Sequence, residues 1–78
     1  MPSTAENYLF DVIPELVERA SAARAEARQK PTADEFAAGR ALAYYEVVSY
    51  LLAQLEAFGI DRKAVRVDPG FDADRELT

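Results

Sequence analysis

Residues 32–59, TADEFAAGRALAYYEVVSYLLAQLEAFG, decide the fold of this chain. Pro31 cannot continue a preceding helix, and Thr32 with Glu35 forms a Thr-x-x-Glu capping box, in which each side chain satisfies a free backbone N–H of the first turn. Gly59 then supplies a left-handed stop of the Schellman type. The sequence therefore predicts a helix of about 26 residues, or ~39 Å at 1.5 Å per residue.

The preceding segment, residues 3–29, carries similar signals. Ser3 and Glu6 form a Ser-x-x-Glu capping box. Apolar residues then recur four and three apart, which is a helix seam; they are Leu9, Ile13, Leu16, Ala20, Ala23 and Ala27. Pro14 interrupts this seam, and a proline inside a helix costs ~3 kcal/mol because it removes one hydrogen bond and clashes with the preceding turn. We therefore expect the first helix to kink sharply or split near Pro14.

The connection between the two predicted helices is short, so they should fold back on each other as an antiparallel pair. The expected fold class is all-α, with a helical hairpin domain over residues 1–59. Residues 60–78 form an acidic C-terminal tail, which we expect to be partly ordered or flexible. Within the tail, Asp68-Pro69-Gly70 predicts a turn, because proline fixes one backbone angle and glycine permits the next.

The second helix is apolar over a wide arc. At 100° per residue, its large apolar side chains span about 160°, whereas the second half of the first helix offers mainly alanine. Because one alanine-rich helix cannot cover that arc, we expect two hairpins to associate as a homodimeric four-helix bundle. The alternatives are a monomer whose tail covers the face and a heterodimer with an unrelated protein. The predicted interface residues are Ala41, Tyr44, Tyr45, Val48, Leu51, Leu52 and Leu55.

The composition excludes several kinds of site. The chain has no cysteine, histidine or tryptophan, which removes disulfides, Cys/His zinc sites and Ser-His-Asp or Cys-His nucleophiles. Its net charge of −5 argues against binding to nucleic-acid phosphates. Three glutamates, Glu35, Glu46 and Glu56, fall on the polar side of the second helix, away from the core. We therefore expect no cofactor, no metal and no catalytic residue, and the chain is predicted not to be an enzyme.

Two smaller features carry expectations of their own. Arg24, Arg28 and Arg40 form a basic patch near the hairpin turn that could bind an acidic segment of a partner, although a solvated face with local ion pairs is the favoured explanation. Gly39 and Ala43 form a small-xxx-small pair, which predicts close packing of the second helix against the first.

The expected function is that of a small, non-catalytic protein-interaction module acting as a homodimer. An adaptor or regulatory subunit and an antitoxin- or immunity-like inhibitor fit equally well. The alternative is a carrier of a small apolar ligand held between the helices near Tyr44, Tyr45 and Leu52. No signal peptide and no stretch of ~20 apolar residues is present, so the expected location is the cytoplasm, away from membranes.

Overall fold

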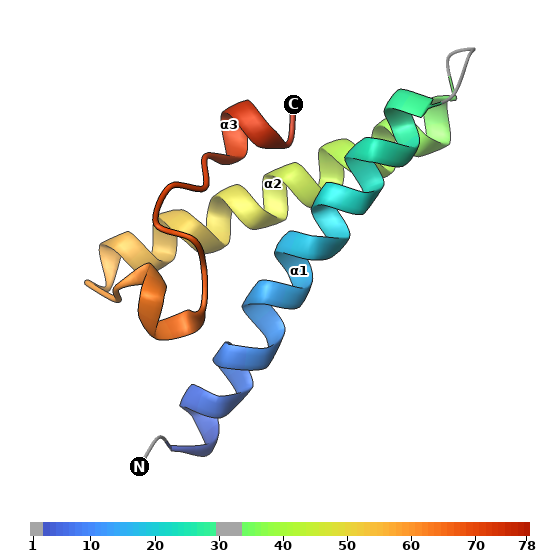
Figure 1. The fold of residues 1–78 in the computed structure, drawn as a ribbon. Coiled ribbons are helices and arrows are strands. Elements are labelled where there is room, and N and C mark those ends of the chain that lie inside the picture. Colours follow the sequence, from blue (N-terminus) through green and yellow to red (C-terminus); the bar gives the residue numbers. More distant parts are fainter. Residues whose placement is uncertain (1–2, 30–33) are drawn as a thin grey trace.

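A computed structural model describes residues 3–29 and 34–78, and that part of the chain forms two long helices and two short ones. They are α1 (Thr4–Gln29), α2 (Glu35–Ala57), the 3₁₀ helix η1 (Arg62–Val65) and α3 (Ala73–Glu76). The helices α1 and α2 run side by side in opposite directions, and the C-terminal segment returns across them (Figure 1). The molecule is elongated, measuring 49 × 20 × 16 Å. The predicted all-α hairpin is confirmed.

Both long helices begin at a side-chain cap. The backbone N–H of Glu6 donates to Ser3 Oγ at 3.1 Å, and the Ser3 hydroxyl donates to Glu6 Oε1 at 3.3 Å, so the first predicted cap is confirmed. In α2 the cap is Asp34, whose carboxylate accepts the backbone N–H of Ala37 at 3.1 Å. The other expected cap, Thr32, lies outside the described residues. Asp34 takes the role because its extended backbone aims its carboxylate at the free N–H groups of the first turn.

The end of α2 is the predicted Schellman motif. Gly59 has a positive φ of 69°, and its N–H donates to the carbonyl of Glu56 at 3.0 Å. The N–H of Ile60 donates to the carbonyl of Leu55 at 2.8 Å. These two bonds satisfy carbonyls that the helix itself leaves free. The helix end predicted at Gly59 is therefore confirmed.

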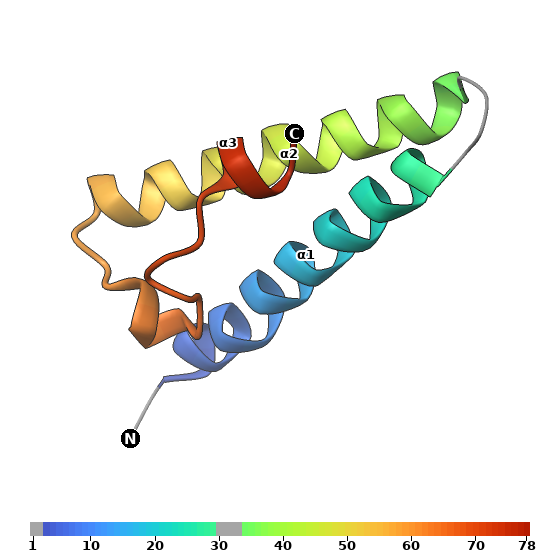
Figure 2. The ribbon, with the colours of Figure 1, turned by 45° about the horizontal axis from the view of Figure 1, so that its top comes forward.

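Helix α1 continues through Pro14. It is one unbroken helix from Thr4 to Gln29, and no sharp bend is visible in Figures 1 and 2, so the expected split is wrong. The reason is burial on both sides of the proline. Ile13 is fully buried, and Phe10 and Val17 pack against the same core. At ~1.5–3 kcal/mol for each buried apolar side chain, this packing exceeds the ~3 kcal/mol cost of the proline.

The two long helices lie close together at the hairpin end and diverge at the other end (Figure 2). Small side chains permit the close approach, since Ala20 and Ala23 of α1 and Ala37 of α2 are all buried. Larger side chains in the first half of α1 hold the helices apart. The opening is filled by η1 and the residues after it, where Val65 and Val67 are buried in the common core.

Gly39 does not mediate this close approach. The residue is exposed, and a Cβ added to it would meet nothing within 4 Å. The expected packing of Gly39 and Ala43 against the first helix is therefore wrong. Helix α1 instead packs on the side of α2 that carries Ala37, Val48 and Leu52, because the larger apolar side chains gain more from burial there.

Candidate functional site

The C-terminal segment covers part of the apolar arc of α2. A turn begins at Asp68, whose carbonyl accepts the N–H of Phe71 at 3.0 Å and whose carboxylate accepts the N–H of Gly70 at 2.9 Å. This is the turn predicted from Asp68-Pro69-Gly70. Residues 72–78, here named the strap, then run back along α2 (Figures 1 and 2). Within the strap, Leu77 is only 4% exposed and belongs to the core. The strap is thus held by apolar burial as well as by polar contacts.

Three side chains of the hairpin hold the strap by hydrogen bonds. Arg24 Nε donates to the backbone carbonyl of Thr78 at 3.1 Å, and Arg28 Nη2 donates to the same oxygen at 2.5 Å. The hydroxyl of Tyr45 donates to the carboxylate of Asp74. This bond, together with desolvation, raises the pKa of Tyr45 above its ordinary value, because both disfavour the charged phenolate.

The predicted basic patch is therefore engaged within the chain. Arg24 and Arg28 bind the strap, and Arg40 Nη1 lies 3.2 Å from Glu26 Oε2 on α1. The Arg40 guanidinium also lies over the Tyr44 ring, 5.3 Å from its centroid. Because both side chains of the Arg40–Glu26 ion pair are substantially exposed, the pair contributes at most about 1 kcal/mol to the stability of the folded chain.

The seven predicted interface residues divide into two sets. Val48, Leu52 and Leu55 are buried inside the chain's own core. The remaining four are half-buried: Ala41, Tyr44, Tyr45 and Leu51. Of these, Tyr44 and Tyr45 pack against the core.

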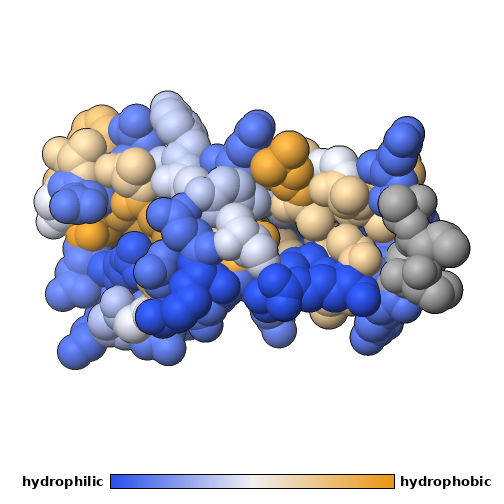
Figure 3. Space-filling view, turned by 90° about the horizontal axis from the view of Figure 1, so that it is seen from above, coloured by the Kyte–Doolittle hydropathy of each residue, from blue (hydrophilic) through white to orange (hydrophobic). Residues whose placement is uncertain are grey.

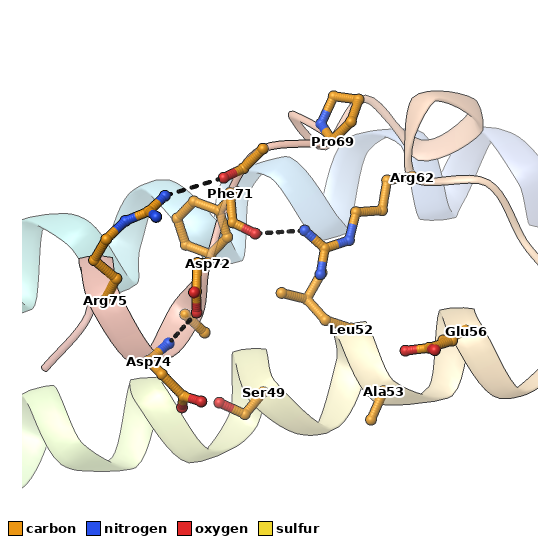
Figure 4. Close-up of a pocket in the computed structure, with 12 residues that line it drawn as sticks. Ser49, Leu52, Ala53, Glu56, Arg62, Pro69, Phe71, Asp72, Asp74 and Arg75 are labelled. Carbon is orange, nitrogen blue, oxygen red and sulfur yellow. Dashed lines mark hydrogen bonds between the residues drawn. The ribbon is translucent and has the colours of Figure 1, made fainter.

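A hollow of about 520 Å³ lies between α2 and the C-terminal segment (Figure 4). Its lining is mainly polar. Arg62 Nη1 donates to the carbonyl of Phe71 at 2.5 Å, and Arg75 Nη2 donates to the carbonyl of Gly70 at 3.3 Å, so both arginines brace the C-terminal segment. Glu56 also lines the hollow, which opens widely to solvent. The arrangement supports the fold of the segment and does not resemble an enclosed apolar ligand site.

The side of α2 that faces away from α1 is open and apolar. Phe36 is 79% exposed, Tyr50 64%, Phe58 76% and Val47 46%. We name this surface the outer face of α2 and define it by its exposed apolar residues Phe36, Ala43, Val47, Tyr50, Ala57 and Phe58. Seen from above, one face of the molecule shows apolar surface beside charged groups (Figure 3). Large aromatic side chains exposed in one row are typical of an interaction surface.

The helical wheel did not identify the whole outer face. Its arc included Val47 and Phe58 but excluded Phe36 and Tyr50, which lie beyond one edge of the arc. The available signal was the spacing of seven residues that relates Phe36, Ala43, Tyr50 and Ala57. Such a spacing places residues on one side of a helix.

Comparison with known proteins identifies no relative, since no family model, no curated protein and no solved structure matches the chain. Among residues 3–29 and 34–78, no group of three or more acidic side chains is placed to hold a metal ion. Within the same residues, no helix is both long and apolar enough to cross a membrane.

Proposed function

We propose that the chain is a small, non-catalytic protein-interaction module that acts as a homodimer through the outer face of α2. One observation carries the proposal: α2 is apolar on two sides, and the chain itself covers only one of them. A helix that is apolar nearly all round is normally buried on all sides. Burying the exposed aromatic side chains Phe36, Tyr50 and Phe58 would contribute several kcal/mol of hydrophobic free energy, which the isolated chain does not gain.

The proposal differs from the sequence-based one in the position of the interface. The expected interface centred on Val48, Leu52 and Leu55, which the chain uses for its own core. The outer face lies on a different side of α2, beyond one edge of the expected interface, and leaves the core and the strap undisturbed. The cytoplasmic location expected from the sequence belongs to the same proposal.

The carrier alternative has weaker support. The hollow of about 520 Å³ is polar and open, and other, more apolar hollows have volumes of about 230–290 Å³. Leu52 is buried in the core rather than facing an enclosed cavity between the helices.

The proposal is tested by light scattering on a sizing column over a wide range of concentrations. We expect the wild-type chain to elute with a mass near twice 8.6 kDa. Tyr50→Glu, which places a charge on the outer face, should give a folded monomer, whereas Tyr8→Glu, at an equally exposed tyrosine on α1, should remain dimeric. Circular dichroism checks that both variants stay helical. A wild-type chain that stays monomeric at every concentration would overturn the homodimer.

A further inference from the structure

The outer face of α2 carries a repeating pattern of large and small side chains. Phe36, Ala43, Tyr50 and Ala57 follow one another at intervals of seven residues, and all four are exposed. Seven residues are nearly two helical turns, and the drift is only about 20° per interval. The four residues therefore form one row along the helix, in which an aromatic side chain alternates with an alanine.

We propose that the second copy packs its α2 against this row in the antiparallel direction, with a two-fold axis passing between Glu46 and Val47. This inference rests on the proposed homodimer and specifies its geometry. Read backward, the row Phe-Ala-Tyr-Ala becomes Ala-Tyr-Ala-Phe. The antiparallel register therefore sets Phe36 opposite Ala57 of the second copy and Ala43 opposite Tyr50 of the second copy. Every layer then pairs one large side chain with one small one, which is the condition for interdigitation.

The neighbouring row of α2 fits the same axis. It contains Arg40, Val47 and Gln54, again at intervals of seven. In the antiparallel register Arg40 lies about one residue, or ~1.5 Å, from the level of Gln54 of the second copy, and Val47 lies near its own symmetry mate. The valines thus meet at the centre. The guanidinium of Arg40 stays on Glu26 and Tyr44 of its own chain, so only the aliphatic part of Arg40 borders Gln54 at the rim. Both rows are self-complementary, as a two-fold interface requires.

Parallel registers satisfy the pattern less well. An in-register parallel pair would place Phe36 on Phe36 and Ala43 on Ala43, which alternates crowded layers with empty ones. A parallel pair shifted by seven residues restores the large–small alternation but leaves Phe36 of one copy and Ala57 of the other without an opposite residue. That arrangement is also head-to-tail, so it does not close into a dimer.

The area of the outer face is sufficient for a specific dimer. Its three aromatic side chains together expose roughly 450 Å², given their usual size and their exposed fractions of 64–79%. With Val47, the alanines and the aliphatic part of Arg40, we estimate about 700 Å² per chain, close to the ~800 Å² per partner of a standard interface. The outer face is therefore large enough without a contribution from α1.

The chain contains no cysteine, so single introduced thiols report the register directly. The test uses a short bifunctional thiol cross-linker on folded, full-length variants. We expect Val47→Cys to cross-link to itself, because residue 47 lies beside the axis. Phe36→Cys alone should not cross-link, because the antiparallel register separates the two thiols by about 31 Å along the helices. A mixture of Phe36→Cys and Ala57→Cys chains should give the mixed cross-linked dimer.

The outcomes separate the two proposals. Efficient self-cross-linking of Phe36→Cys, or failure of the mixed pair while Val47→Cys succeeds, would overturn the antiparallel register and leave the homodimer standing. A monomeric wild-type chain in the light-scattering experiment would remove the homodimer and the register together. Far-ultraviolet circular dichroism of each cysteine variant confirms that the hairpin is intact.

Discussion

At the scale of single residues, left-handed backbone angles mark two chain reversals. Gly59 ends α2 with φ of 69°, and Arg66 follows η1 with φ of 61°. Both reversals are closed by the same kind of hydrogen bond, from an N–H to a carbonyl five residues earlier. The N–H of Val67 donates to the carbonyl of Arg62 at 2.9 Å, and the N–H of Ile60 donates to the carbonyl of Leu55. A side chain at such an angle is unfavourable, and at Arg66 a stacking contact offsets part of this cost, since its guanidinium lies 5.7 Å from the centroid of the Phe10 ring.

Alanine at two of the glycines should have opposite effects. Gly39→Ala should stabilise the chain by about 0.5–1 kcal/mol, because position 39 is helical, exposed and free of neighbours. Gly59→Ala should destabilise it by about 1 kcal/mol, because alanine resists the positive φ. Urea unfolding of the two variants measures both effects. The slope of the unfolding free energy against urea concentration is expected to stay constant. Equal effects of the two substitutions would show that the backbone angle does not matter at Gly59.

Tyr45 should titrate above the ordinary pKa of a tyrosine side chain. Its hydrogen bond to Asp74 raises its pKa in the folded chain, so the bond stabilises the strap fully at pH values below the unfolded-state pKa of about 10. That contribution is lost as the pH rises through the higher folded-state value, because the phenolate no longer donates. The ultraviolet absorbance of tyrosinate, compared between the wild type and Tyr45→Phe, isolates this titration. Asp74→Asn should return the pKa of Tyr45 toward its ordinary value. Titration of Tyr45 at that ordinary value in the wild type would refute the assignment.

At the scale of elements, the C-terminal segment completes the fold. The hairpin alone would leave an opening between α1 and α2, because α1 has large side chains at one end and alanines at the other. Val65 of η1 and Val67, just after it, fill this opening, and the strap adds Ala73 and Leu77 to the same core. The C-terminal segment, although most of its side chains are polar, is therefore also part of the apolar interior.

Loss of the buried side chain in the strap should be costly. Leu77→Ala should destabilise the chain by about 2–4 kcal/mol, because it removes a core leucine and leaves a cavity. Leu42→Ala is the matched control: Leu42 is 57% exposed, so the same substitution there should cost at most about 1 kcal/mol. Thermal unfolding, monitored by circular dichroism, compares the stabilities of the two variants. Similar costs at both positions would mean that the strap contributes little to stability.

At the scale of the whole molecule, the two sides of α2 have different roles. One side holds the core of the chain together, and the proposed dimer uses the other. The proposed axis brings the exposed Glu46 near Glu46 of the second copy, so each dimer contains one close pair of like charges. Such a pair weakens association by a few tenths of a kcal/mol to about 1 kcal/mol.

Removal of that charge should strengthen the dimer. Glu46→Gln is expected to lower the dissociation constant about two- to fivefold at low salt, with the difference shrinking as salt is added. Glu56→Gln changes the net charge equally but lies on another side of α2, beside the polar hollow, so it should leave the constant nearly unchanged. Sedimentation equilibrium measures both. An equal effect of the two substitutions would point to net charge and not to a contact at the axis.

The local features could be predicted from the amino-acid sequence alone: two long helices, the cap at Ser3, the stop at Gly59 and the turn at Asp68. Each depends on residues within a few positions of one another, so local hydrogen bonding and backbone preference suffice to specify it. The continuation of α1 through Pro14 and the exposure of Gly39 depend instead on how the helices pack. The same is true of the cover that the C-terminal segment, together with α1, gives to α2. These outcomes depend on burial between distant segments, which outweighs local preference and determines which side of α2 remains exposed.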